Sequence, residues 1–244
     1  MIPANLPIIS SSLVQHESIR YALITTAAIG EKMLVVSGDT SSFQGRKHDT
    51  SDALICPLTP ENAAELRRRL PWLNPVSLGT RTSAGFGDRL GCATVGHLIA
   101  TEGTGVAPIL AQQSVRENTR TGRTPQQVLD DAMWGAFEYG WRDPWGADAD
   151  HLKMLDDIVP FVDAGYTFFT IDPGDYVDDA ADTYDLLTLR EKAQMLDWLL
   201  LDSSPDDLIA RFSGQVALDG LTLDLNEEKL LRAAVKYGAA IVHT

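Results

Sequence analysis

Short apolar segments alternate with amphipathic segments of helical length between residues 75 and 177. This alternation is typical of βαβ units, in which parallel strands are joined by crossover helices. One helix has a clear start, because Thr124 can act as its N-cap and Gln127 follows in the first turn. The pattern predicts strands at residues 76–79, 108–112, 146–151 and 167–172, and helices at residues 94–101, 124–139 and 153–164.

The segments before residue 75 and after residue 177 do not show this alternation of strands and helices. Residues 33–37 predict an apolar strand. Residues 60–70 predict a helix, because a Thr-Pro pair favours its start and three arginines favour its end. Further along, apolar residues recur at helical spacing across residues 186–201. A last helix is predicted at residues 226–237, followed by an apolar run that can extend it.

We therefore expect an α/β fold of the TIM type, a (β/α) barrel of which only the first half is present. Four strand and helix units cannot close a barrel that needs eight strands. Residues 1–74 are predicted to form a small N-terminal cap region, and residues 75–244 a partial barrel with a helical insertion after residue 177. Apolar residues continue to the last positions, so we expect the chain to be a fragment of a longer protein.

The composition is that of an ordinary globular protein, with 44% hydrophobic and 22% charged residues. Cys56 and Cys92 have neither metal-ligand nor disulfide-framework spacing, which indicates reduced thiols in a reducing compartment. No basic stretch precedes a leader-like apolar run, and no segment approaches the roughly 18 apolar residues of a membrane span. We therefore expect a cytoplasmic protein with no membrane partner.

The charge of the chain is strongly negative and unevenly spread. A net charge of -14 argues against a nucleic-acid partner, which would require a clustered basic surface. Residues 76–124 nevertheless hold five arginines against three acids, whereas residues 143–185 hold twelve aspartates and a single lysine. The first stretch therefore suits an anion and the second a cation, although each charge can also belong to a solvated helix face.

A glycine-rich loop at residues 77–91 follows the first predicted strand of the βαβ region. Its glycines allow a ligand to approach the backbone, and Asp88 and Arg89 add an acceptor and a fork of donors. The loop lacks both the G-x-G-x-x-G fingerprint and the G-K-[ST] ending of nucleotide-binding loops. Asp88 and Arg89 are therefore candidates for substrate binding, and the alternative is a turn in which they pair with each other.

The next predicted strand ends in two glutamines and a serine, before a loop that carries three arginines. Adjacent strand residues face opposite ways, so only one of Gln112 and Gln113 can point towards a ligand at the strand end. These residues suit the hydroxyl groups or the carboxylate of a sugar acid better than catalysis. The substrate-binding candidates here are Gln112, Gln113 and Arg116, and the alternative for the arginines is a surface position.

The last two predicted strands end in groups that suit a divalent metal. Asp148 and Asp150 lie on one face of the first strand, His151 lies at its end, and the second strand ends at Asp172. Because neighbouring strands are about 4.8 Å apart, His151 and Asp172 are predicted to reach one metal ion. Aspartates that cap a helix or pair with an arginine are the alternative. The candidate catalytic residues are Asp150, Asp172 and Asp175, and Lys153 is a further candidate for substrate binding.

Several long segments of the chain resemble the tagaturonate epimerase family. The resemblance covers roughly residues 75–177 and returns near the end of the chain. The segments that carry it are GTRTSAGFGDRLG, AQQSVREN, RTGRTPQQVLDDAMWG, WGADADHLK, FTIDPGDYV and RAAVKYGAAIVHT.

The resemblance implies a metal-dependent epimerase of hexuronate catabolism that interconverts tagaturonate and fructuronate. Its substrate would be a small anionic sugar acid, its cofactor a divalent metal ion, and a homo-oligomer is one possible assembly. Members of the family are barrel-type enzymes longer than this chain, so part of the active site is expected beyond Thr244. The alternatives are another metal-dependent barrel isomerase or aldolase, or a non-catalytic carbohydrate-binding remnant.

The expected reaction poses a chemical problem. The carbon whose configuration differs between the two keturonates is β to the ketone, so its proton is not acidified as an α proton would be. Retro-aldol cleavage followed by re-addition to the other face of the aldehyde avoids this difficulty.

Overall fold

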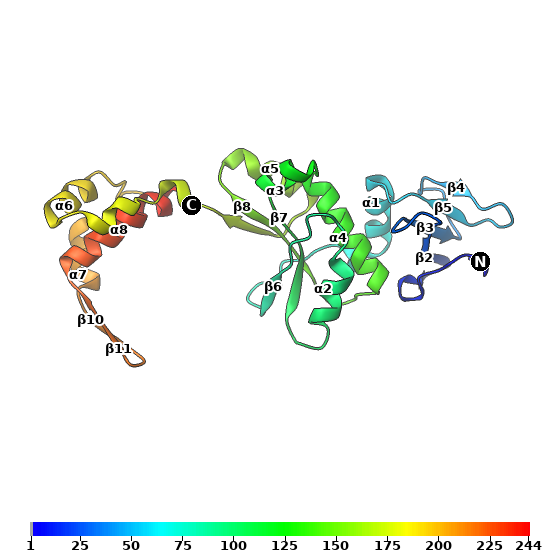
Figure 1. The fold of residues 1–244 in the computed structure, drawn as a ribbon, viewed down its shortest axis with the longest axis horizontal. Coiled ribbons are helices and arrows are strands. Elements are labelled where there is room, and N and C mark those ends of the chain that lie inside the picture. Colours follow the sequence, from blue (N-terminus) through cyan, green and yellow to red (C-terminus); the bar gives the residue numbers. More distant parts are fainter. Residues whose placement is uncertain (1) are drawn as a thin grey trace. The chain divides into compact units, whose positions relative to one another are not determined.

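The computed structural model describes residues 2–244, which form two compact units that meet at Thr170 and Ile171 (Figure 1). The first unit contains an antiparallel sheet and a parallel sheet, and the second contains helices and one hairpin. None of the helices in residues 2–244 is long and apolar enough to cross a membrane.

An antiparallel sheet of five strands occupies the start of the first unit, after a short 3₁₀ turn at Ser10–Ser12. One of its strands, at residues 33–37, was predicted, and the others were not. The strand order is β1-β2-β3-β5-β4, and one face buries Ala22, Val35 and Ile55. The strands are β1 (Val14–His16), β2 (Ile19–Thr25), β3 (Lys32–Ser37), β4 (Arg46–Lys47) and β5 (Leu54–Cys56).

Helix α1 (Pro60–Arg69) follows this sheet, as its sequence predicts. The side chain of Thr59 accepts a hydrogen bond from the backbone N–H of Asn62, and three arginines occupy the last turn. A 3₁₀ turn, Pro71–Leu73, then leads towards the second sheet of the unit.

The second sheet has four strands in the order β6-β7-β8-β9, and its β6–β7 and β7–β8 pairs are parallel. Three of the four predicted strands are confirmed within a few residues. The prediction at residues 76–79 is wrong, because the chain there makes one backbone bond towards β8, from Val76 N–H to Trp145 O, and then turns at Gly79. The strands are β6 (Ser83–Gly85), β7 (Ala107–Ser114), β8 (Gly146–Leu152) and β9 (Phe168–Ile171).

Helices connect the parallel strands, and α2 and α4 pack against β7. The three predicted helices are confirmed, and the Thr124 and Gln127 side chains form the expected capping box at the start of α4. A further short helix replaces an expected loop, because Ser114 and Glu117 form a second capping box. The helices are α2 (Thr94–Thr101), α3 (Val115–Thr121), α4 (Pro125–Tyr139) and α5 (Leu155–Ala164).

The second unit buries Leu189, Leu231 and Val235 at its centre. The helix predicted at residues 186–201 ends early, and the last helix extends through the apolar run to His243. Two 3₁₀ turns, Gly174–Tyr176 and Asp179–Thr183, begin the unit. The other elements are α6 (Leu186–Gln194), α7 (Pro205–Phe212), the strands β10 (Gly214–Leu218) and β11 (Leu221–Leu225), and α8 (Glu227–His243).

The expected TIM-type barrel is wrong for the described residues. They form a five-stranded antiparallel sheet, an open parallel sheet of four strands and a separate hairpin, which together are a mixed α/β arrangement. Four parallel strands leave two free edges, and closing a barrel takes eight. Most strands of the antiparallel sheet pair with their neighbours along the chain, as His16 with Ile19 and Thr25 with Lys32, yet only residues 33–37 were predicted. The β4 strand, Arg46–Lys47, has no apolar residue that could have indicated it.

Candidate active site at the strand ends

A row of hydrogen-bonded side chains crosses one face of the parallel sheet. Gln112 on β7 donates from Nε2 to Asp148 Oδ2 on β8 at 3.0 Å. Thr170 on β9 donates to both oxygens of the same carboxylate, at 2.9 and 3.2 Å. Gln112 and Asp148 are partners in the parallel register, so the row follows from the strand pairing itself.

Asp148 is the buried member of this row, with 2% of its surface exposed. Burial raises the pKa of Asp148 above its ordinary value, and the bonds from Gln112 and Thr170 offset this only in part. The negative charge of Asp150 raises the pKa further, and the positive charge of His151 lowers it. A carboxyl group with a raised pKa at a strand end marks a candidate functional site.

Asp150 and His151 lie at the carboxyl end of β8. Asp150 follows Asp148 on the same face of the strand and pairs in register with Ser114 on β7. His151 Nε2 lies 3.5 Å from Asp150 Oδ2, and the imidazole is 55% exposed. The backbone of His151 is left-handed, with φ 52°, a conformation that non-glycine residues rarely adopt. Such an outlier at a strand end is a recognised feature of functional sites.

Gln113 faces the opposite side of β7 from Gln112, as strand alternation predicts. Its Oε1 accepts a hydrogen bond from Arg123 Nη1 at 3.2 Å, and the residue is fully buried. The Arg123 guanidinium also bonds the carbonyl of Asp88 and pairs with Asp131 on α4. Gln113 therefore helps to join the sheet to its helix layer, while its role in substrate binding stays a prediction.

Asp88 organises the loop between β6 and α2. Its carboxylate accepts hydrogen bonds from the backbone N–H groups of four residues, at distances from 2.6 to 3.3 Å. Burial by itself would raise the pKa of Asp88, but these four donors together lower it. The carboxylate is therefore ionised and stabilises the start of α2, and a contact between Asp88 and substrate stays a prediction.

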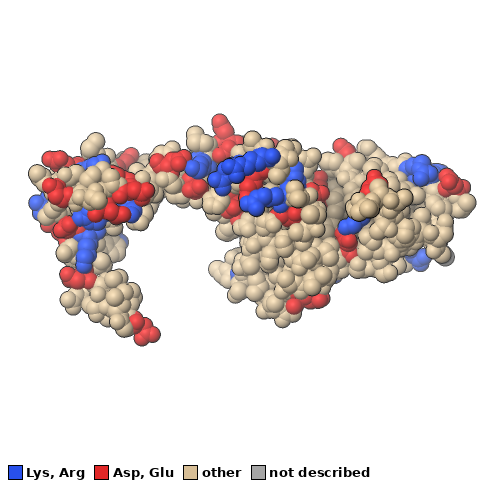
Figure 2. Space-filling view, in the orientation of Figure 1, with Lys and Arg blue, Asp and Glu red and all other residues tan. Residues whose placement is uncertain are grey.

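Exposed cationic side chains gather near the same strand ends, and Figure 2 shows Lys and Arg side chains over α3 and α5. Arg89 pairs with Glu117 rather than with Asp88, while its guanidinium remains 67% exposed. Arg116 is exposed and forms no ion pair with any residue between 2 and 244. Lys153 is also exposed, directly after β8. These three residues offer positive charge to an anionic ligand.

A comparison with known proteins identifies the family. Residues 9–244 match the sequence profile of UxaE, the tagaturonate epimerase family. The chain belongs to this family. The resemblance of the sequence segments is thereby confirmed, and the similarity extends beyond them into both units of the chain.

Individual members of the tagaturonate epimerase family are also similar to this chain in sequence and in structure. The tagaturonate/fructuronate epimerase of Thermotoga maritima is 39% identical over an alignment of 217 residues, which covers 87% of this chain and 44% of that protein. The native structure of the Cohnella laeviribosi fructuronate-tagaturonate epimerase UxaE has a TM-score of 0.85 at 30% identity, and its glycerol complex has the same values. These comparisons cover 97% and 96% of this chain but 48% and 47% of the respective structures, so the chain spans about half the length of these relatives.

Two of the predicted site residues, Asp172 and Asp175, belong to the second unit. Asp172 follows β9 directly, and its Oδ1 accepts a hydrogen bond from the backbone N–H of Gly174 at 3.0 Å. Asp175 lies in the 3₁₀ turn that follows and is exposed. Because His151 lies in the first unit, the shared metal site of His151 and Asp172 stays a prediction.

The donors at the strand ends suit part of the divalent metal site that the sequence predicts. Asp150 and His151 supply a carboxylate and an imidazole side by side, which are ordinary ligands of divalent transition metals. Across residues 2–244, no three His, Cys, Asp or Glu side chains come together in a group that could hold a metal ion. The described residues therefore provide a pair of donors rather than a complete set.

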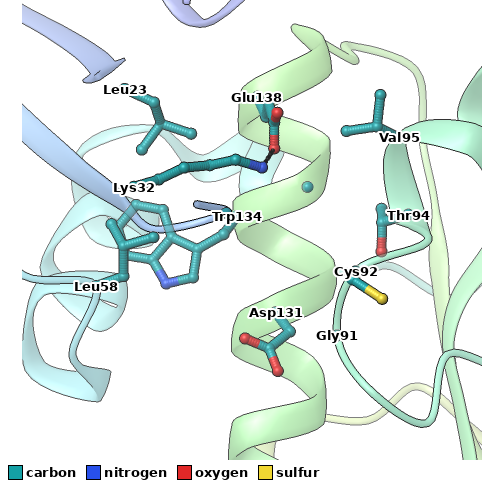
Figure 3. Close-up of a pocket in the computed structure, with 12 residues that line it drawn as sticks. Leu23, Lys32, Leu58, Gly91, Cys92, Thr94, Val95, Asp131, Trp134 and Glu138 are labelled. Carbon is teal, nitrogen blue, oxygen red and sulfur yellow. Dashed lines mark hydrogen bonds and ion pairs between the residues drawn. The ribbon is translucent and has the colours of Figure 1, made fainter. Parts of the chain in front are cut away.

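A pocket of about 300 Å³ lies over α4, between the antiparallel sheet and the start of α2 (Figure 3). Its lining contains none of the residues predicted from the sequence. Two lining residues of the pocket, Lys32 and Glu138, pair with each other. A third, Asp131, pairs with Arg123, which does not line the pocket. Because these charges are already neutralised, the strand ends, with the unpaired Arg116, are the better candidate for binding an anion.

Two residues of the site were not singled out from the sequence. Thr170 holds Asp148 from the neighbouring strand, and a side chain at Gly85 would collide with the Gln112 amide. The alternation along β9 places Thr170 and Asp172 on one face of the strand. This alternation was the only sequence feature that could have indicated a role for Thr170. Gly85 was visible merely as one glycine of a glycine-rich loop.

Proposed function

We propose that this protein interconverts tagaturonate and fructuronate, as a cytoplasmic epimerase of hexuronate catabolism. The match of residues 9–244 to the tagaturonate epimerase family carries this proposal. The parallel strand ends support it, because they combine exposed cations for a carboxylate with polar side chains for hydroxyl groups. The substrate is accordingly a small anionic sugar acid.

In this proposal the cationic residues bind the substrate carboxylate. Arg116 has no competing ion pair with a described residue, and Arg89 keeps most of its guanidinium exposed beside Glu117. Lys153 adds a flexible charge at the end of β8. Gln112 contacts the hydroxylated part of the sugar acid, where an amide can donate or accept hydrogen bonds.

Asp150 is proposed as the group that takes the hydroxyl proton during retro-aldol cleavage. Loss of that proton turns the carbinol carbon into an aldehyde, and the bond to the α carbon breaks. The electron pair remains on the α carbon, which becomes part of an enediolate. Re-addition to the other aldehyde face reforms the bond, and Asp150 returns the proton to the inverted hydroxyl group. Asp172 and Asp175 are the other candidates for this proton transfer.

A divalent metal ion is proposed to be held by His151 and Asp172. A bound divalent ion supplies positive charge against the negative charge that develops during cleavage. The imidazole of His151 is more than half exposed, so it is open to such a ligand from the solvent side.

Turnover in heavy water tests both the activity and its route. We expect the complete enzyme to turn tagaturonate into fructuronate without deuterium at the inverted carbon, because retro-aldol chemistry never breaks the C–H bond there. The neighbouring enediolate carbon can take up deuterium. Mass spectrometry and NMR of the product measure both positions. Stoichiometric deuterium at the inverted carbon would exclude the retro-aldol route, and absence of fructuronate would exclude the activity itself.

Metal analysis tests the ligands independently of activity. We expect the complete protein, purified without chelator, to contain about one divalent ion per chain, and His151→Ala and Asp172→Ala each to lower that occupancy because a ligand is lost. His48→Ala is a matched control, since His48 bonds only its own turn at Thr50 and Ser51. Unchanged occupancy in both site variants would remove these residues from the metal site.

A further inference from the structure

The orientation of the Gln112 amide is fixed by its partner on β8. Gln112 Nε2 donates to Asp148 Oδ2 at 3.0 Å, so the NH₂ end of the amide faces the carboxyl group. Asp148 is itself held by the Thr170 hydroxyl, which donates to both of its oxygens. The two bonds together make the amide of Gln112 directional rather than free to flip.

Gly85 on β6 gives this amide the space that it occupies. A Cβ atom at Gly85 would lie 2.2 Å from Gln112 Oε1 and 2.3 Å from Nε2, far closer than atoms can approach. The backbone of Gly85 is not left-handed, so its conformation does not require glycine. The absence of a side chain at this position therefore serves the close approach of Gln112.

The carbonyl oxygen of Gln112 is left as an acceptor. Its NH₂ group is bonded to Asp148, and no group within residues 2–244 donates to Oε1. The residue is partly exposed, on the face of the sheet that carries Asp148 and Asp150. A carbonyl oxygen repels a carboxylate and accepts from a hydroxyl group, which sugar acids carry on most of their carbons.

We propose that Gly85, Asp148 and Thr170 are positioning residues that present the Gln112 carbonyl oxygen to a hydroxyl group of the sugar-acid substrate. This inference rests on the proposed function and assigns separate parts of the substrate to separate residues. The Gln112 carbonyl accepts a hydrogen bond from a hydroxyl group of the substrate, and the exposed cations bind its carboxylate. The three positioning residues act through Gln112 and need not touch the substrate.

Two pairs of matched variants test the proposal. Gly85→Ala should displace the Gln112 amide, whereas Gly87→Ala should not, because a Cβ at Gly87 would meet only the Gln112 backbone oxygen at an ordinary 3.5 Å. Thr170→Val removes the hydroxyl group that holds Asp148, and Thr170→Ser retains it. A flexible amide can move aside, so all four variants are expected to fold.

The readouts are the side-chain amide resonance of Gln112, assigned by its loss in Gln112→Met, and the kinetics with tagaturonate. We expect Gly85→Ala and Thr170→Val to shift this resonance and to raise KM about 3- to 10-fold with little change in kcat, the range of one lost hydrogen bond. Gly87→Ala and Thr170→Ser should behave like the unaltered protein. An unshifted resonance in Gly85→Ala and Thr170→Val, or a shifted resonance with unchanged KM, would overturn the proposal.

The resonance also separates this inference from the proposed function. If the unaltered protein neither binds nor converts tagaturonate, the proposed function fails, and with it the assignment of the hydroxyl group to tagaturonate. The positioning of the amide is still decided in that case, because the Gln112 resonance responds to Gly85→Ala and Thr170→Val without substrate.

Discussion

Arg67→Met is expected to lower the free energy of unfolding by about 3–5 kcal/mol, the range for removing one partner of a buried ion pair. Arg67 on α1 pairs with Asp130 on α4, and their side chains are only 11% and 7% exposed. The Asp130 carboxylate keeps a bond from Gln126, but it would otherwise be a buried charge without a counter-ion. Urea unfolding, followed by tryptophan fluorescence, measures the change.

The loss should depend on pH. Burial already raises the pKa of Asp130, and the charge and hydrogen bond of Arg67 hold it down in part. Without Arg67 the folded-state pKa rises further, so the native variant retains a proton that the unfolded chain has released. Its stability therefore falls as pH rises through the interval between the two pKa values. The destabilisation should thus be smaller in mild acid than at pH 7.

Arg68→Met is the matched control for Arg67→Met. Arg68 is the next residue of the same helix, is 63% exposed, and pairs with Glu65 on its own helix. The Glu65 side chain is only 12% exposed, but it keeps the guanidinium of Arg69 as a second partner, so the loss of Arg68 should cost less stability than the loss of Arg67. Equal destabilisation by Arg67→Met and Arg68→Met, or an Arg67→Met effect that does not vary with pH, would contradict the role assigned to the buried pair.

Asp150→Asn should reduce the turnover of tagaturonate by about 10²- to 10⁴-fold, the usual contribution of a positioned acid or base. Asparagine keeps the size of the side chain but cannot accept the hydroxyl proton. KM should change much less than kcat, because the carboxylate binding residues are intact. Steady-state kinetics by NMR detection of fructuronate measures both constants.

Asp163→Asn controls for the loss of one negative charge, since Asp163 is an exposed residue of α5. We expect its turnover to equal that of the unaltered protein. If Asp150→Asn keeps turnover within tenfold of the unaltered protein, the proton passes to another group, and Asp172 and Asp175 become the residues to examine.

Elements with local signals could be predicted from the sequence, and those that depend on distant partners could not. The Thr59 cap of α1 and the Thr124 capping box of α4 involve residues three apart, so the sequence displays them. Strand β6 is Ser83–Gly85, which has no apolar pattern and becomes a strand only through its pairing with β7. The antiparallel sheet is an exception, because its β1–β2 and β2–β3 pairs join neighbours along the chain and were nevertheless not predicted.

In the candidate site, too, the features that depend on local sequence were predicted and those that depend on distant partners were not. Strand alternation separated Gln112 from Gln113 and placed Asp148 with Asp150, because a period of two needs no tertiary information. Outside the site, Arg67 and its partner Asp130 lie 63 residues apart, and no local pattern connects them. The bonds of Thr170 to Asp148 required the order of the strands in the sheet, which a repeating pattern suggests but does not fix.

The hairpin of β10 and β11 should form early when the protein folds. Its strands pair from Gly214 with Leu225 to Leu218 with Leu221, around the two residues Asp219 and Gly220. Such local pairing takes about 1–10 μs, because only a short loop must close. The β7–β8 pair instead joins residues that the whole of α3 and α4 separates, and closing that longer loop costs more chain entropy. The parallel strand ends, and the candidate site on them, are therefore expected to form among the later steps of folding.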